Sequence, residues 1–96
     1  MEIDIKKKAS VFKALSNPVR LEMVVMLYNV EMSVNEIAEK VNSIHPELDR
    51  TSISKHLTVL KNNGLVTSRS EGNKNLYTLK AVCLIEMMNC TNKINH

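Results

Sequence analysis

Hydroxyl-bearing and cationic side chains gather on one face of the segment RTSISKHLTVLKNNGL, residues 50–65. Ile53, Leu57 and Leu60 recur there at the i, i+4, i+7 spacing of an apolar helical stripe. The side chains that turn away from this stripe are Arg50, Thr51, Ser54, Lys55 and Thr58. Such groups can hydrogen-bond phosphate oxygens and base edges, which is what a DNA-reading helix requires. The segment therefore predicts a recognition helix.

The residues ahead of this segment predict the helices that must position it. A first helix over about residues 4–15 ends before Ser16-Asn17-Pro18. Asn17 suits the N-cap of a second helix and Pro18 its first position, because proline has no N–H to lose there. This second helix runs to about Asn29 and is apolar on most of its circumference, which predicts burial between neighbouring elements.

A third helix is expected to begin at Ser33, where S-V-N-E fits a capping box closed by Glu36. The linker NSIHPELD, residues 42–49, follows, and Asp49 can cap the recognition helix that begins at Arg50. Two short helices in succession, the second with a polar outward face, suggest a helix-turn-helix. The linker is longer than the usual turn of about three or four residues. It therefore either adds a helical turn or repositions the recognition helix.

Beyond Gly64, which suits the C′ position of the recognition helix, the apolar period changes from helical to alternating. LVTSRS and LYTLK flank the turn EGNKN, which predicts a β-hairpin with apolar anchors at Leu65, Leu76, Tyr77 and Leu79. A hairpin in this position is a wing. Near its tip lie Arg69, Asn73, Lys74 and Asn75, which could lie along phosphates or enter a minor groove, and the alternative is an ordinary solvent-exposed hairpin.

The charge of the chain is unevenly distributed. Residues 1–49 carry a net charge of −2, residues 50–80 carry +5 and residues 81–96 are balanced, which returns the net +3 of the whole chain. A basic segment in an otherwise slightly acidic chain is typical of a surface that meets nucleic acid. Charge alone favours the simpler alternative of a solvated charged face.

Size and composition limit the other functional classes. The 96 residues, 44% of them hydrophobic, predict one domain with a modest core, so we expect burial to be completed in a homodimer. The sequence has no membrane-spanning run and no signal peptide, so we expect a cytoplasmic protein. It also has no nucleophile and base at recognisable spacing and no glycine-rich phosphate loop, so we expect no enzyme and no cofactor.

Taken together, these runs resemble the ArsR-type (ArsR/SmtB) family of winged-helix repressors. The resemblance covers about residues 9–90 and is carried by A-L-S-N-P-V-R-L at the entry to the second helix and by TSISKHLTVLKNNGLV. It implies a mainly α fold with a small β-hairpin, in the order of four helices, two strands and a terminal helix. It also implies a dimer formed by the first and last helices, a recognition helix in the major groove, and repression relieved by a ligand.

The family's DNA contacts fall on residues of the recognition helix and the wing: Arg50, Thr51, Ser52, Ser54, Lys55, His56, Arg69 and Lys74. Arg50 is suited to a bidentate guanine contact, and it stands where many relatives have glutamine, which implies a changed base preference. Lys55 is suited to a phosphate. His56 borders the apolar stripe, so a structural histidine and a phosphate contact remain equally open.

The effector cannot be assigned in the same way. Metal-sensing relatives place a Cys-x-Cys pair where this chain has Ser33 and Asn35, which are poor ligands for such metals. A second family site on the terminal helix falls on Ala81 and Cys83 and is not intact. Cys83, Cys90 and His96 remain as candidate ligands or redox thiols, and packed, reduced cysteines are the favoured alternative.

The sequence therefore predicts that residues 1–96 form a single winged helix-turn-helix domain. The predicted function is a dimeric repressor that binds a palindromic operator in double-stranded DNA and responds to an unidentified effector. The alternative is a winged-helix protein-interaction module without DNA binding.

Overall fold

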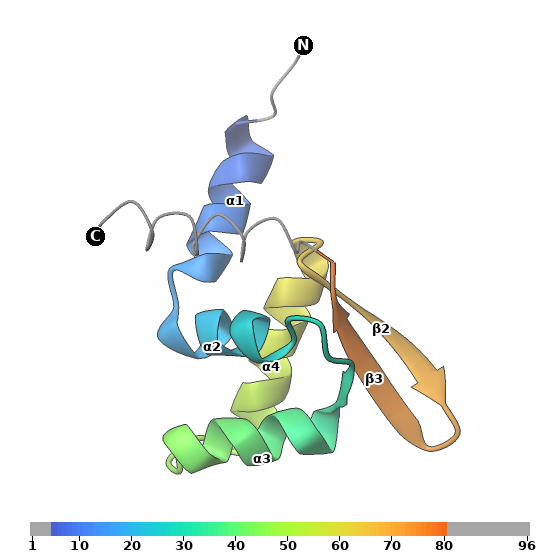
Figure 1. Cartoon of the computed structure of the whole chain (residues 1–96). Coiled ribbons are helices and arrows are strands. Elements are labelled where there is room, and N and C mark those ends of the chain that lie inside the picture. The colour runs from blue at the N-terminus through green and yellow to red at the C-terminus, as the bar shows by residue number, and fades with distance from the viewer. Residues whose placement is uncertain (1–4, 81–96) are drawn as a thin grey trace, which may run out of the picture.

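The computed structural model describes residues 5–80. The terminal helix predicted from sequence, with Cys83, Cys90 and His96, lies outside the described residues. The elements run in the order α1 (Ile5–Leu15), α2 (Pro18–Met26), β1 (Met32–Ser33), α3 (Val34–Ile44), α4 (Arg50–Asn62), β2 (Val66–Glu71) and β3 (Lys74–Leu79). Figure 1 shows α2, α3 and α4 grouped together while the β2–β3 hairpin extends away beside them. This is the predicted winged helix-turn-helix arrangement.

The helices begin at the predicted caps. The Asn17 side chain accepts from the backbone N–H groups of Val19 and Arg20, at 2.9 and 3.2 Å. At α3 the capping box is complete, because the Glu36 N–H donates to Ser33 Oγ at 3.2 Å and the Ser33 N–H donates to Glu36 Oε1 at 2.9 Å. Each such cap contributes about 1 kcal/mol to helix stability. The boundaries of the two helices therefore follow from local chemistry.

Both ends of α4 are also fixed locally. Asp49 Oδ1 accepts from the Ser52 N–H at 2.7 Å, as its predicted role as cap requires. At the other end Gly64 has φ +73, a conformation that glycine adopts without a Cβ penalty. The Leu65 N–H donates to Leu60 O at 3.0 Å and the Gly64 N–H to Lys61 O at 3.0 Å, the paired bonds of a Schellman motif. The recognition helix is therefore closed at a defined residue at each end.

The predicted extent and burial of α2 were wrong in part. The helix ends at Met26 instead of about Asn29, and Leu27 to Asn29 form a turn that finishes with Asn29 at φ +59. Its apolar circumference is not fully covered either. Met23 and Val24 are completely buried, whereas Val25 is 53% exposed within the described part of the chain. One face of α2 packs on the core and another lines an open groove.

The sheet contains a strand that sequence patterning did not reveal. The two-residue strand β1 pairs antiparallel with β3, Met32 opposite Tyr77 and Ser33 opposite Leu76, so the strand order is β1-β3-β2. Two residues are too short to display the alternation from which strands are predicted. The wing is thereby joined directly to the start of α3.

The core lies between the three central helices and the base of the sheet. The predicted stripe of α4, Ile53, Leu57 and Leu60, is at most 1% exposed. It packs in a cluster whose other large, fully buried side chains are Met23, Val24, Leu27, Ile37, Val41 and Val66. Leu65 and Leu79 from the hairpin are buried as well, as predicted. Because α4 is buried along this stripe, its opposite face is held outward.

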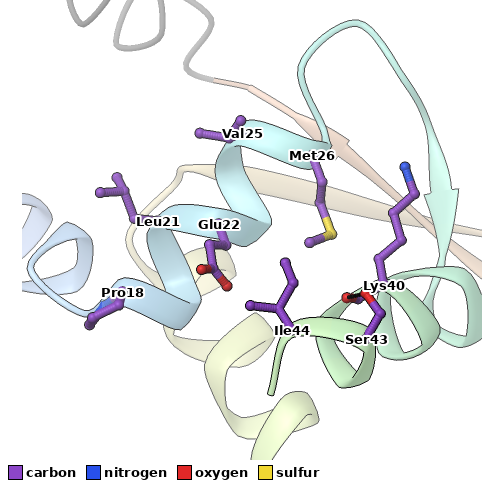
Figure 2. A pocket seen from close by; sticks show the side chains of 8 residues that line it. All are labelled: Pro18, Leu21, Glu22, Val25, Met26, Lys40, Ser43 and Ile44. Atoms are coloured by element: carbon purple, nitrogen blue, oxygen red, sulfur yellow. Dashed lines mark hydrogen bonds between the residues drawn. The ribbon is translucent and has the colours of Figure 1, made fainter. Parts of the chain in front are cut away.

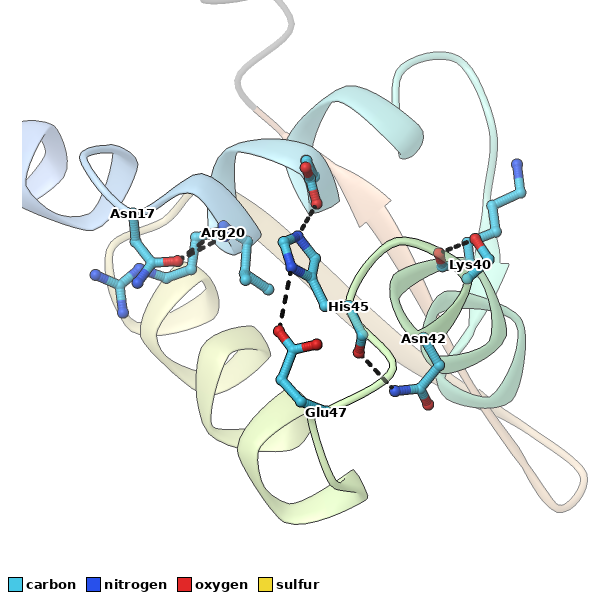
Figure 3. Close-up of polar contacts among 9 residues, drawn as sticks. Asn17, Arg20, Lys40, Asn42, His45 and Glu47 are labelled. Carbon is cyan, nitrogen blue, oxygen red and sulfur yellow. Dashed lines mark hydrogen bonds and ion pairs between the residues drawn. The ribbon is translucent and has the colours of Figure 1, made fainter.

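The linker ahead of α4 is ordered by side-chain contacts. The helix α3 continues to Ile44, past the predicted start of the linker at residue 42, which leaves only residues 45–49 as connection. The Asn42 side chain donates to His45 O at 3.2 Å and to Leu48 O at 2.8 Å. The His45 ring lies 2.8 Å from Glu22 Oε2 on α2 and 3.6 Å from Glu47 (Figure 3). These contacts fix the linker between α2, α3 and the start of α4.

None of the helices in the described part of the chain has both the length and the apolar character needed to cross a membrane.

Candidate nucleic-acid interface

The outward face of α4 carries most of the predicted contact residues. Arg50, Thr51, Ser54 and Lys55 are exposed, and Ser52 is half-buried. The Thr58 hydroxyl, farther along this face, donates to Ser54 O of its own helix at 3.0 Å. The first turns of α4 therefore present a cluster of hydroxyls and two cations to solvent.

Arg50 is held by a residue of another helix. An N–H of its guanidinium donates to Asn35 Oδ1 in the first turn of α3. Both side chains are exposed, and the two residues lie 15 positions apart in the chain. Asn35 was not among the predicted contact residues, because no local pattern links it to Arg50.

Arg50 and Asn35 form part of the wall of a polar hollow of about 300 Å³. The other lining residues come from the start of α3, from α4 and from the wing: Ser33, Val34, Ser54, Asn73, Lys74, Asn75 and Tyr77. Lys74 brings a second cation to the same hollow. Residues of α3, α4 and the wing thus line one hollow, with no carboxylate among its lining residues.

Arg69, the other predicted wing contact, is already paired. Its Nε and a terminal nitrogen donate to the two carboxylate oxygens of Glu31 at 2.9 and 2.8 Å. A second terminal nitrogen lies 2.9 Å from Glu71 Oε2, and the Thr78 hydroxyl donates to Glu31 at 3.2 Å. The hydrogen bonds from Arg69 hold the pKa of Glu31 below its ordinary value. Arg69 thus fastens β2 to the segment before β1.

His56 occupies a different environment from the exposed α4 residues. It is half-buried, and Arg20 places a terminal nitrogen 3.5 Å from its Nδ1. Arg20 is itself fixed, because its Nε donates to Ala14 O at 2.7 Å. Burial, followed by the charge of Arg20, lowers the pKa of His56 below its ordinary value of 6.5. Because a guanidinium can only donate, this contact joins α4 to α2 when His56 is neutral and its Nδ1 accepts.

The positions of the family's metal-sensing cysteines are occupied by residues with structural contacts. Ser33 Oγ caps α3 and Asn35 bonds Arg50. Within residues 5–80 there is no group of three or more histidine, cysteine or acidic side chains that could hold a metal ion. The remaining candidates, Cys83, Cys90 and His96, lie outside the described residues.

An apolar groove lies between α2 and α3, lined by neither Arg50 nor Lys74. It encloses about 660 Å³ and is lined by Pro18, Leu21, Glu22, Val25, Met26, Lys40, Ser43 and Ile44. Figure 2 shows Val25 and Met26 on α2 and Ile44 on α3 beside this space. The groove contains none of the residues predicted to contact DNA.

Comparison with known proteins gives a consistent result. Residues 15–69 match a family described as a helix-turn-helix domain. The chain is 33% identical to the transcriptional activator HlyU of Vibrio cholerae over 92% of its own length and 80% of that protein. It is 31% identical to the arsenical resistance operon repressor of Staphylococcus aureus, over 94% of this chain and 82% of that one.

Solved structures show the same likeness. The structure of HlyU from Vibrio cholerae superposes with a TM-score of 0.79 at 32% identity, covering 95% of this chain and 97% of that one. A homodimeric winged helix-turn-helix DNA-binding domain from Mycobacterium bovis, described as a possible ArsR-family regulator, gives a TM-score of 0.76 at 28% identity. That match covers 96% of this chain and 86% of the other.

Proposed function

This chain belongs to the ArsR family of winged helix-turn-helix transcriptional regulators, and from that premise we propose that it acts as a homodimeric repressor on a palindromic DNA operator. In this proposal α4 enters the major groove and the wing tip lies along the adjacent backbone. Operator half-sites would then be separated by about one helical turn of DNA or a multiple of it. Because the proposed partner is DNA, we also propose a cytoplasmic location.

The observation that carries this proposal is the placement of α4. Its apolar stripe is buried and both of its ends are closed, so Arg50, Thr51, Ser54 and Lys55 are held on an exposed surface. Lys74 of the wing shares a hollow with Arg50. A convergence of hydroxyls and cations without a lining carboxylate suits the phosphate backbone of DNA.

The roles that we assign within this surface differ. Arg50 reads a base edge, since its fork matches the acceptors of guanine. Lys55 and Lys74 contact phosphates, and the hydroxyls of Thr51, Ser52 and Ser54 bond phosphates or bases. Arg69, a predicted DNA contact, and His56, for which a phosphate contact and a structural role were equally open, have partners within the protein, and we assign them supporting roles.

HlyU is named an activator and the arsenical resistance relative a repressor. We favour repression because a dimer seated on an operator blocks access to it. The relatives are transcriptional regulators, and we propose no enzymatic activity for this chain. Relief of repression by an effector remains part of the proposal, with Cys83, Cys90 and His96 as its candidate contacts.

Salt dependence of binding to duplex DNA tests the function. The logarithm of the binding constant should fall linearly with the logarithm of the salt concentration. Each lost phosphate contact should reduce the slope of this line by about 0.9. We therefore expect Lys55→Ala and Lys74→Ala each to weaken binding to all sequences and to lower the slope by about one. Fluorescence anisotropy with labelled duplexes over a salt series measures both quantities.

Lys61→Ala is the matched control. Lys61 is exposed on the same helix, but it lies in the last turn of α4, beside Asn62 and Gly64. We expect its substitution to leave the slope unchanged. If the unmodified protein shows no duplex binding at low salt, the repressor function is wrong and the protein-interaction module takes its place.

A further inference from the structure

The bond between Arg50 and Asn35 leaves the arginine available for a ligand. The Arg50 side chain makes no other hydrogen bond within residues 5–80, and Arg50 lines the hollow between α3, α4 and the wing, so its remaining N–H groups are available to a ligand there. Its partner is a neutral amide, which accepts a hydrogen bond without cancelling the positive charge. Arg69 is the contrast, because two carboxylates occupy its guanidinium.

The backbone of Asn35 is held in place at the start of α3. It follows Val34 at the start of α3, where the Ser33–Glu36 capping box closes the helix end. Ser33 in turn pairs with Leu76 of the wing strand β3. The backbone that carries the Asn35 side chain is thus fixed by the capping box of α3 and, through Ser33, by the pairing with wing strand β3.

From this geometry we infer that Asn35 is a positioning residue for base recognition, which fixes the guanidinium of Arg50 in the orientation needed for a guanine edge. The inference rests on the proposed function. A bidentate contact requires the planar fork to be aligned with the two base acceptors, and a free arginine must lose rotamer freedom to reach that state. Asn35 supplies that restriction before DNA arrives, so the base preference depends on a residue outside the recognition helix.

The test compares base preferences by selection from random duplexes, using the unmodified protein, Asn35→Ala, Arg50→Ala and the double variant. Asn35→Ala should lose preference at the same base pairs as Arg50→Ala, by about tenfold at the positions read by Arg50. The double variant should be no worse than Arg50→Ala alone, because Asn35 acts only through Arg50. A loss caused by general damage to the fold would not show this dependence.

Asn62→Ala is the control, since Asn62 is an exposed helical asparagine in the last turn of α4. It should retain the full preference. Thermal unfolding should show that Asn35→Ala remains folded, as expected for an exposed side chain. The inference is overturned if Asn35→Ala keeps the preference, or if the two losses multiply in the double variant. Should the unmodified protein enrich no sequence, the proposed function fails and the inference with it.

Discussion

At the scale of single residues, the cations of residues 50–80 differ in whether a carboxylate pairs with them. Lys74 is exposed beside the hollow, whereas Arg69 is surrounded by Glu31 and Glu71. We predict that Arg69→Ala leaves the salt slope of DNA binding unchanged, in contrast to Lys74→Ala. The same anisotropy series measures both. A slope reduced by about one in Arg69→Ala would restore Arg69 as a phosphate contact.

His56 makes a prediction about pH. Its pKa is lowered in the folded protein, so the unfolded chain takes up the proton first as pH falls. Stability should therefore be complete above the ordinary value of 6.5 and decrease as pH falls from there through the lowered folded-state pKa. Urea unfolding of the unmodified protein and of His56→Gln, at pH 7 and at pH 5.5, measures the difference.

Protonation of the acidic groups affects the stability of the unmodified protein and of His56→Gln equally. The unmodified protein should lose more stability than His56→Gln between the two pH values. Equal losses would mean that His56 is not kept neutral by its burial and by Arg20.

At the scale of elements, the C-terminal end of α4 depends on one backbone conformation. Gly64 has φ +73, yet a Cβ added there would meet no atom within 4 Å. Gly64→Ala should therefore destabilise the fold by about 1 kcal/mol through backbone strain alone. Gly64→Asn should cost less, because asparagine tolerates the left-handed region better. Midpoints of urea unfolding report both, and an unchanged midpoint in Gly64→Ala would contradict the assignment.

The same elements show what sequence can predict. The caps at Asn17, Ser33 and Asp49 and the end at Gly64 depend on residues within a few positions of each other, and all were predicted correctly. The strand β1 and the bonds Asn35–Arg50 and Glu31–Arg69 join residues that are distant in the chain. Nothing in local spacing identifies such partners, so the exposed face of α4 was predictable but the contacts that orient Arg50 and Arg69 were not.

At the scale of the whole molecule, α1 carries an apolar face that the described residues leave uncovered. Ile5 is 71% and Phe12 is 67% exposed, and their spacing of seven places them on one side of the helix. The family resemblance assigns α1 to the dimer interface. Because burying a phenylalanine side chain contributes about 1.5–3 kcal/mol, Phe12→Asp should weaken dimerisation by at least about tenfold.

Sedimentation equilibrium measures this change. Ser70→Asp adds the same charge on the exposed wing and should leave the dimer intact. If Phe12→Asp sediments as the unmodified protein does, α1 does not form the interface through this face.

Ser33 belongs to two elements at once, since it caps α3 and also pairs with Leu76 of the wing strand. The pairing of Ser33 with Leu76 joins the wing to the start of α3, and α3 packs against α4. The recognition helix and the wing are therefore linked through α3. Because a protein whose two DNA-contacting elements are linked in this way favours DNA with a matching backbone spacing, we expect the stiffness of base pairs that the protein does not touch to contribute to its selectivity.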